Sequence, residues 1–221
     1  SYRNYRAATG FTPLLADVNE LYNQFAYGHT QHPLSIRNFC EFALDTFTVK
    51  PDYLLLIGKS VSPEKTRYNI NNWNTNLVPT FGFPPSDLLL ASLYNDTLPR
   101  AEISVGRISA STENDVQSYL DKITVHEQQL QQCPQEWMKQ VLHFGGGSNQ
   151  GEQVEIRNIL LDLESVVEDT LMGGNVTTFL KTSPDPIQVN QSQYLQALID
   201  SGVTLMTFVA HASGTTFDIS T

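Results

Sequence analysis

The feature that most constrains the fold of this chain is the alternation of short apolar runs with longer amphipathic segments. Runs typical of buried strands lie at residues 53–57, 140–144, 176–180 and 202–210. In the segments 14–25, 34–47, 111–132, 151–168 and 191–201, apolar residues recur every three or four positions, as in helices with one buried face. Strands that alternate with helices indicate parallel βαβ units, so we predict an α/β fold with a parallel, doubly wound sheet.

The first half of the chain is less regular than the second. Residues 58–86 are rich in Asn, Pro, Ser and Thr and show no sustained periodicity, which predicts a long surface loop. The apolar residues at 88–93 and 102–105 are two further strand candidates. The run at 53–57 is apolar at every position, so we expect a central strand that is buried on both faces.

Charge and cysteine content exclude several classes of protein. The chain carries 13 Lys and Arg against 23 Asp and Glu, and this net charge of −10 disfavours nucleic acid and anionic membranes as partners. Two cysteines, Cys40 and Cys133, are too few for a disulfide framework or a Cys-rich zinc module. No apolar run is long enough for a transmembrane segment, and we expect neither a metal nor a cofactor.

The ends of the chain suggest a piece of a longer protein. It starts at Ser1 without an initiator methionine or a signal peptide, and it stops at Thr221 shortly after a predicted strand. We therefore expect the second part of the fold to be truncated. The strand at 202–210 would then have an unpaired edge, which favours dimerisation.

The most conspicuous motif follows the predicted strand at 140–144. Residues 145–152 read Gly-Gly-Gly-Ser-Asn-Gln-Gly-Glu, in which Gly146 and Gly151 have the spacing of a phosphate-binding loop. That loop needs lysine where this chain has Glu152, and a carboxylate there would repel phosphate. Nucleotide binding is therefore disfavoured, and the segment is either a flexible strand–helix turn or the lining of a substrate site.

Among the five histidines, His211 has the position that best suits chemistry. It directly follows the last predicted strand, and ligands of parallel sheets bind at the carboxyl ends of the strands. An imidazole there could act as a general acid or base, although a structural histidine is equally compatible with the spacing. His143 lies within a predicted strand and is expected in the core, and His29 and His32 have no third metal ligand nearby.

Five ordered segments resemble the gingipain-type cysteine peptidases. The segments are 27–39, 51–58, 78–87, 103–123 and 202–213. The second resembles the family's strand PxYVLLVGD, and the last resembles its motif GxxLVNYTGHGS. Several of the segments are more similar to another member of the same group, the outer-membrane sortase of the type IX secretion system.

The resemblance implies a caspase-like fold and acyl transfer by a Cys–His dyad. By match to the motif, His211 would be the dyad histidine, and the backbone N–H of Ala212 would be an oxyanion donor. The family's nucleophilic cysteine lies about one βα unit after the histidine, so it would lie beyond Thr221. Cys40, on the apolar face of a predicted helix, and Cys133, in a predicted turn, would not replace it, so this fragment would be inactive.

The resemblance also implies an organisation and a setting. Residues 1–133 would form a supporting α/β subdomain, and residues 134–221 would form the first half of the caspase-like catalytic subdomain. The substrate would be a polypeptide. The protein would be exported to the exterior or the outer-membrane surface of a bacterium, in association with the outer-membrane secretion machinery.

The chain departs from the family's pattern at two places. Ala212 replaces the glycine after the histidine, which keeps the N–H but restricts the backbone. The acid that orients the family's histidine matches about Ser148 here, and Glu152 is the nearest equivalent of the acid that shapes a substrate pocket for basic residues. The alternative to a peptidase or sortase-like transpeptidase is therefore a degenerate homologue that acts as a non-catalytic binding or scaffold module.

Overall fold

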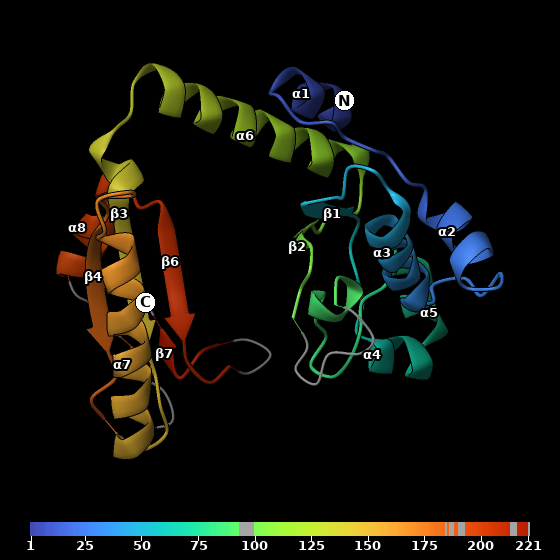
Figure 1. The fold of residues 1–221 in the computed structure, drawn as a ribbon. Helices are drawn as coiled ribbons and strands as arrows, with labels where there is room; N and C mark the ends of the chain where they lie inside the picture. Colours follow the sequence, from blue (N-terminus) through green and yellow to red (C-terminus); the bar gives the residue numbers. More distant parts are fainter. Residues whose placement is uncertain (93–99, 184, 186–187, 190–192, 213–215, 221) are drawn as a thin grey trace. The chain divides into compact units, whose positions relative to one another are not determined.

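The computed structural model describes residues 1–92, 100–183, 185, 188–189, 193–212 and 216–220. The chain forms two compact units, Ser1–Val125 and His126–Thr221, and helix α6 (Glu113–Gln132) passes from the first into the second. Each unit has a parallel sheet and a buried core of its own (Figure 1). The predicted α/β fold with parallel strands is confirmed.

In the first unit, two helices pack on a sheet in which two strands are described. The strands β1 (Tyr53–Ile57) and β2 (Ser104–Ile108) run parallel, with Tyr53 opposite Ser104. Helices α2 (Val18–Phe25) and α3 (Leu34–Thr46) lie beside them (Figure 1). The core between helices and sheet contains Leu21 of α2, Ile36 and Cys40 of α3, and Leu56 of β1.

The expectation that the first strand is buried on both faces is wrong. Leu56 is only 5% exposed, but Tyr53 is 68% exposed, and Leu55 and Ile57 are each 38% exposed. Successive side chains of a strand point to opposite faces, and α2 and α3 cover only the face that carries Leu56. The apolar run therefore reflects one core face and one open face.

The stretch predicted as a long loop contains two short helices, α4 (Pro63–Tyr68) and α5 (Ile70–Thr75). Pro63 stands in the first turn of α4, where its fixed φ suits a helix and its missing N–H is not needed. The Asn69 side chain caps α5 by accepting a hydrogen bond from the Asn71 N–H at 3.0 Å. A proline marks the start of α4 and a side-chain cap marks the start of α5, so a search for apolar periodicity does not detect these helices.

The two strand candidates before α6 have different outcomes. The prediction at 88–93 is wrong where the structure describes it, because Leu88–Leu90 form the 3-10 helix η1; residue 93 lies outside the described residues. Leu90 is fully buried there, so its apolar character reflects the core and not a sheet. The strand predicted at 102–105 forms slightly later in the chain, as β2.

Side-chain caps also set the starts of longer helices. Asp17 accepts a hydrogen bond from the backbone N–H two residues later at 2.9 Å, so α2 begins at Val18 and not at residue 14. The helix predicted at 111–132 is confirmed as α6. Thr112 and Asp115 cap it reciprocally, since each backbone N–H donates to the other's side chain, at 2.9 Å to Asp115 Oδ2 and 3.3 Å to Thr112 Oγ1. The first helix, α1 (Tyr2–Ala8), has no counterpart in the prediction.

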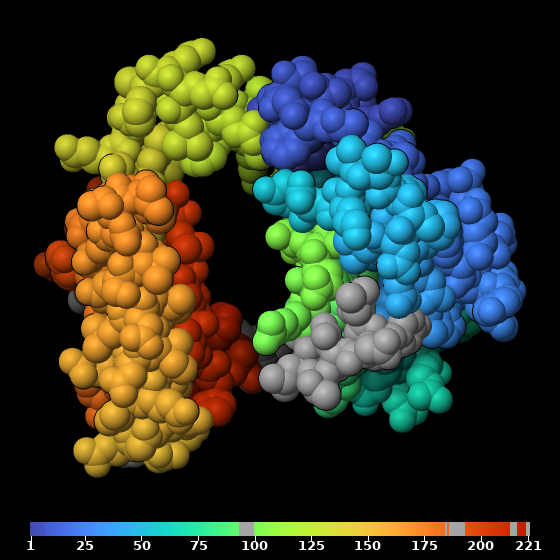
Figure 2. All heavy atoms as spheres, in the orientation of Figure 1, coloured from blue at the N-terminus to red at the C-terminus, as the bar shows by residue number. Residues whose placement is uncertain are grey.

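The second unit is a doubly wound sheet with helices on both faces. Its three described strands have the order β4-β3-β6 and are all parallel, with β3 (Gln140–Gly145) between β4 (Asn175–Leu180) and β6 (Leu205–Val209). Helix α7 (Gln150–Val167) covers one face, and its side chains, gold to orange, hide much of the sheet in Figure 2. Helix α8 (Gln193–Ser201) packs on the opposite face.

Alternate residues of β3 face the two helices. Gly145 lies so close to α7 that an added Cβ would come within 2.9 Å of Leu160, whereas Phe144 packs in one cluster with Leu195 of α8. Because both faces are covered, Phe144 is fully buried and His143 is 1% exposed. His143 thus lies in the core, as predicted, and desolvation by burial lowers its pKa.

The last part of the chain differs in detail from the prediction. The strand predicted at 202–210 forms over a shorter range, as β6. Among the described residues, its neighbour in the sheet is β3. A two-residue parallel pairing of β5 (Gln188–Val189) with β7 (Ile219–Ser220) has no predicted counterpart. Within the described parts of the chain, no helix has both the length and the apolar character needed to cross a membrane.

Candidate functional site

The carboxyl edge of the second sheet brings two loops together. In the register of β3 and β6, Gly145 lies opposite Val209, so the glycine loop after β3 and the segment after β6 leave the sheet as neighbours. The Gly146 N–H donates to the Val209 carbonyl at 2.9 Å and joins the two. His211 follows Val209 after one residue, so it lies beside the glycine loop.

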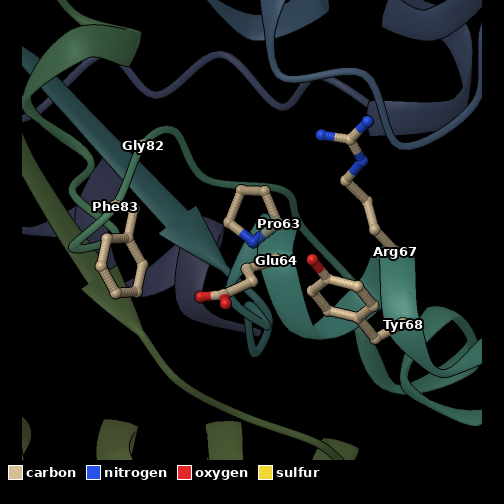
Figure 3. Close-up of a pocket in the computed structure, with 6 residues that line it drawn as sticks. All are labelled: Pro63, Glu64, Arg67, Tyr68, Gly82 and Phe83. Carbon is tan, nitrogen blue, oxygen red and sulfur yellow. The ribbon is translucent and has the colours of Figure 1, made fainter.

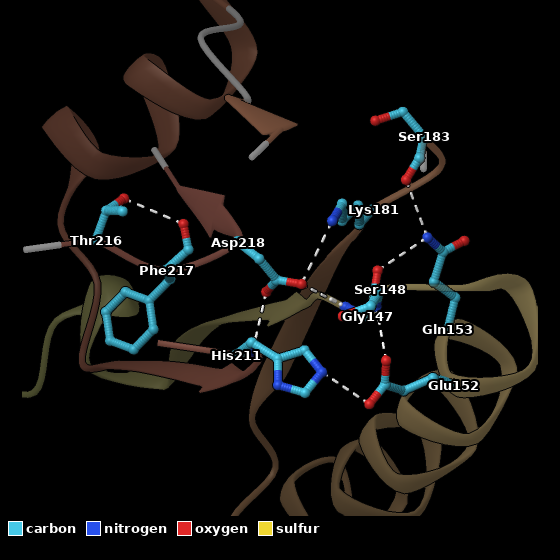
Figure 4. A network of polar contacts seen from close by, with 10 residues as sticks. All are labelled: Gly147, Ser148, Glu152, Gln153, Lys181, Ser183, His211, Thr216, Phe217 and Asp218. Carbon is cyan, nitrogen blue, oxygen red and sulfur yellow. Dashed lines mark hydrogen bonds and ion pairs between the residues drawn. The ribbon is translucent and has the colours of Figure 1, made fainter. Parts of the chain in front are cut away.

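His211 pairs with a carboxylate from the first turn of α7. Its Nε2 lies 2.8 Å from Oε1 of Glu152 (Figure 4). The other Glu152 oxygen accepts from the Ser148 N–H at 2.7 Å, and the Glu152 N–H donates to the side chain of Asn149, the N-cap of α7, at 3.1 Å. The His211 and Glu152 side chains are 56% and 31% exposed, so this pair lies at the surface.

These contacts determine which atom of the pair donates and which accepts. The Ser148 N–H, and after it the His211 ring, lower the pKa of Glu152, so this carboxylate is ionised at neutral pH and acts only as an acceptor. Nε2 of His211 is therefore the donor. The other nitrogen of the neutral ring, Nδ1, is then a hydrogen-bond acceptor, and it has no partner among the described residues. His211 thus presents a basic nitrogen at the edge of the sheet.

A second carboxylate, Asp218, lies beneath the same edge. It accepts from the His211 N–H at 3.0 Å and the Gly147 N–H at 2.9 Å, and its own N–H donates to the His211 carbonyl at 2.9 Å. The ammonium of Lys181, which directly follows β4, lies 3.4 Å away. The Asp218 and Lys181 side chains are 9% and 1% exposed. This buried pair connects the ends of β3, β4 and β6 (Figure 4).

The structure brings together most of the residues that the sequence singled out. His211, Glu152 and Ser148 are in contact, and no acid stands at Ser148 itself, whose N–H serves Glu152. Ala212 is exposed next to His211 and pairs with Phe217 in an antiparallel bridge. Among the described residues, no acceptor for the Ala212 N–H is found.

Two residues of the edge were not predicted. Lys181 directly follows a correctly predicted strand, and the rule that sites lie at carboxyl ends of parallel strands could have found it. Asp218 meets His211 because the neighbouring residues Ala212 and Phe217 pair in an antiparallel bridge. No periodicity in the sequence announces that pairing, so the contact could not be inferred.

The two cysteines differ in their burial and in their place in the fold. Cys40 is buried in the core of the first unit, and desolvation raises the pKa of its thiol to about 11, which disfavours the reactive thiolate. Cys133 is exposed but directly follows α6 and precedes β3, so it lies toward the amino end of that strand. His211 lies at the carboxyl end, on the opposite edge of the same sheet.

Other candidate sites lack comparable chemistry. A groove in the first unit is lined by Pro63, Glu64, Arg67, Tyr68, Gly82 and Phe83 (Figure 3). It contains neither a histidine nor a cysteine, so it offers no thiol–imidazole chemistry. Across the described ranges of the chain, no three His, Cys, Asp or Glu side chains cluster as metal ligands would.

Comparison with known proteins gives a family for the chain. The model of peptidase family C25 matches residues 1–220, nearly the whole chain. No curated protein gives a significant match, and no solved structure does either. The match includes the α/β sheets of both units and the His211 segment, and it agrees with the gingipain-type resemblance in the sequence. The chain therefore belongs to peptidase family C25, a family of cysteine peptidases with a caspase-like α/β fold.

Proposed function

We propose that the carboxyl edge of the second sheet is the histidine half of a Cys–His active site for acyl transfer from peptide bonds. The observation that carries the proposal is the 2.8 Å contact between His211 Nε2 and the ionised Glu152. This contact assigns the ring proton to Nε2 and directs Nδ1 toward the role of a base. A polypeptide is the substrate of this reaction.

In this mechanism His211 first accepts a proton and later donates it. Nδ1 takes the proton of the nucleophilic thiol as the thiolate attacks the carbonyl carbon, and the imidazolium later gives that proton to the departing amine. Glu152 stabilises the imidazolium through Nε2. The Ala212 N–H donates to the oxyanion of the tetrahedral intermediate, which is the role that the family motif gives to this position.

Glu152 thereby takes the orienting role that the family's pattern would place near Ser148. Its two oxygens are engaged by His211 and by the Ser148 N–H. The earlier expectation, that Glu152 shapes a pocket for basic substrate residues, stays a prediction. It would require the carboxylate to bind substrate as well as hold the imidazole.

We further propose that the nucleophilic thiol lies in a segment outside residues 1–221. The buried position of Cys40 and the place of Cys133 at the opposite edge of the sheet support this proposal. Residues 1–133 would then act as a supporting subdomain and residues 134–221 as part of the catalytic one, inactive without the thiol. Export to the bacterial surface, and transpeptidation at the secretion machinery in place of hydrolysis, belong to the same proposal.

A thiol-directed peptide probe tests the proposed chemistry on the polypeptide that carries the downstream segment. We expect covalent labelling by a peptidyl acyloxymethyl ketone, and loss of labelling in His211→Ala because the thiolate loses its partner. His29→Ala, at an exposed histidine of the first unit, is the matched control and should label like the wild type. Labelling that persists in His211→Ala would contradict the proposal. A folded wild type that does not label would favour the alternative of a non-catalytic binding or scaffold module.

A further inference from the structure

The buried carboxylate of Asp218 has an unusual number of partners at the catalytic edge. One oxygen accepts from the His211 N–H at 3.0 Å, and the other accepts from the Gly147 N–H at 2.9 Å. The Asp218 N–H also donates to the His211 carbonyl at 2.9 Å. Both backbone polar groups of His211 are therefore bound by one residue.

Lys181 supplies the charge that makes this burial feasible. Its side chain is 1% exposed, and its ammonium lies 3.4 Å from Asp218 Oδ2. A carboxylate that is removed from water needs a counter-charge and hydrogen-bond donors, and Lys181 with the two backbone N–H groups provides both. The Lys181 N–H also donates to the Gly145 carbonyl at 2.7 Å, which anchors the lysine to the end of β3.

The glycine loop is shaped around this carboxylate. A Cβ at Gly146 would collide with Oδ1 of Asp218 and would come within 2.9 Å of the Cβ of Ala210. Glycine at this position therefore allows the loop, the strand end before His211 and Asp218 to approach one another closely. The three segments form one packed unit below the exposed His211–Glu152 pair.

We propose that Asp218, neutralised by Lys181, is a positioning residue that holds the backbone of His211 at the catalytic edge. The described hydrogen bonds between Asp218 and His211 all involve the His211 backbone, so Asp218 acts through the main chain and not on the substrate. By fixing His211 against Gly147, it keeps the imidazole within reach of Glu152 and sets the direction of the Ala212 N–H. This inference rests on the function proposed for His211.

The test uses a charge-neutral double variant, Lys181→Met/Asp218→Asn, with Lys181→Met as its control. Asparagine keeps one carbonyl oxygen, so it can accept from only one of the two N–H groups, and its amide opposes the other. Lys181→Met keeps both carboxylate oxygens. In the double variant we expect amide hydrogen exchange at His211 or Gly147 to be about 10- to 100-fold faster than in the wild type, because a hydrogen bond to a charged group is lost.

The Gly146 amide is the internal reference, because it donates to the Val209 carbonyl and not to Asp218. Its exchange should not change in either variant. Equal protection of the His211 and Gly147 amides in the wild type and the double variant would overturn the proposal. If Lys181→Met alone fails to fold, the double variant still decides the question, since it leaves no buried charge without a partner.

Kinetics of the polypeptide that carries the nucleophile separate positioning from a merely structural role. We expect kcat of the double variant to fall at least about tenfold with KM nearly unchanged, because the loss affects how the base is placed and not how substrate binds. An unchanged kcat beside loosened amides would overturn the positioning role and leave the proposed function standing. An unreactive wild type would instead overturn the proposed function.

Discussion

The carboxyl edges of the two sheets each have a largely buried ion pair, but they differ in the polar groups that lie around it. In the first unit, Arg107 at the end of β2 makes a two-pronged ion pair with Asp87, at 2.8 and 2.7 Å. Its remaining N–H groups donate to the carbonyls of Gly58, Val78 and Pro79. Each guanidinium nitrogen donates to a protein acceptor. We therefore call this edge sealed.

In the second unit one charged pair at the edge is buried, and a second, more exposed pair lies above it. The pair of Asp218 and Lys181 satisfies backbone groups below the edge, while His211 and Glu152 remain exposed above it. The first edge engages every guanidinium N–H with protein acceptors, whereas the second keeps the His211 and Glu152 side chains at the surface, as the proposed site requires. The predictions below test this contrast through the free energy of unfolding of each unit.

Removal of the Arg107 side chain should have the largest effect. Arg107→Met deletes its hydrogen bonds to three carbonyls and leaves the Asp87 carboxylate, whose side chain is 22% exposed, without its cation. We expect the free energy of unfolding of the first unit to fall by about 3 kcal/mol or more, which is typical when one partner of a largely buried pair is removed. Urea unfolding followed by the fluorescence of Trp73, in a Trp137→Phe background, measures it.

The control for this prediction is Arg100→Met, at an exposed arginine of the same unit. Exposed substitutions of this kind change stability by no more than about 0.5 kcal/mol. Equal midpoints for the two variants would mean that Arg107 does not seal the edge. The contrast between the two edges would then not hold for the first unit.

A methyl group at Gly146 should have the next largest effect, on the second unit. Gly146→Ala forces a Cβ against the Asp218 carboxylate, and overpacking of this kind costs about 1–3 kcal/mol. The matched control is Gly106→Ala in β2, where the nearest atom, Leu55 Cδ1, lies 3.9 Å from the added Cβ. Trp137 fluorescence reports the second unit and Trp73 the first. Similar losses in the two variants would show that the second edge is not packed more tightly than a strand of the first.

Acid should weaken the first unit by a smaller amount. Desolvation alone would raise the pKa of Asp87, but hydrogen bonds from Arg107 and Thr80 and the charge of Arg107 outweigh it and hold the pKa below 3.8, its ordinary value. A carboxyl whose pKa is lowered by folding contributes stability that is present above the ordinary value and is lost as pH falls through the lowered one. Below pH 3.8, the wild type should therefore lose stability more steeply than Asp87→Asn. An equal loss of stability with falling pH in the wild type and in Asp87→Asn would contradict the lowered pKa of Asp87. The loss stays below that of Arg107→Met because a protonated Asp87 still accepts hydrogen bonds.

The contrast between the two edges also explains what the sequence could predict. The apolar pattern predicts β3 and α7, which contribute buried residues to the core, and also α6, although no residue of α6 is buried. His211 stands out because it directly follows the strand predicted at 202–210. The seal at Arg107 depends on the Asp87 side chain and on backbone carbonyls that lie 20 to 49 residues away in the sequence. The base at Asp218 depends on the N–H of Gly147, which lies 71 residues away. Single-sequence patterns carry no record of such contacts. The same limit explains why β1 looked buried on both faces: the composition of a strand does not show how many faces are covered.

Neutralising Glu152 should have the smallest effect on stability and still impair the proposed reaction. The Glu152 side chain is 31% exposed and pairs with His211 at the surface, and surface ion pairs contribute little to folding, so Glu152→Gln should unfold at the wild-type midpoint. In the polypeptide that carries the nucleophile, kcat/KM should fall about 100-fold, because glutamine does not stabilise the imidazolium. Glu155→Gln, an exposed position on the same helix, is the matched control and should leave both quantities unchanged. A variant that loses stability but keeps its rate would reverse the contrast, since the exposed pair would then serve the fold, as Arg107 does in the first unit. We expect loss of rate without loss of stability because the Glu152 and His211 side chains contribute to the proposed reaction and little to the fold.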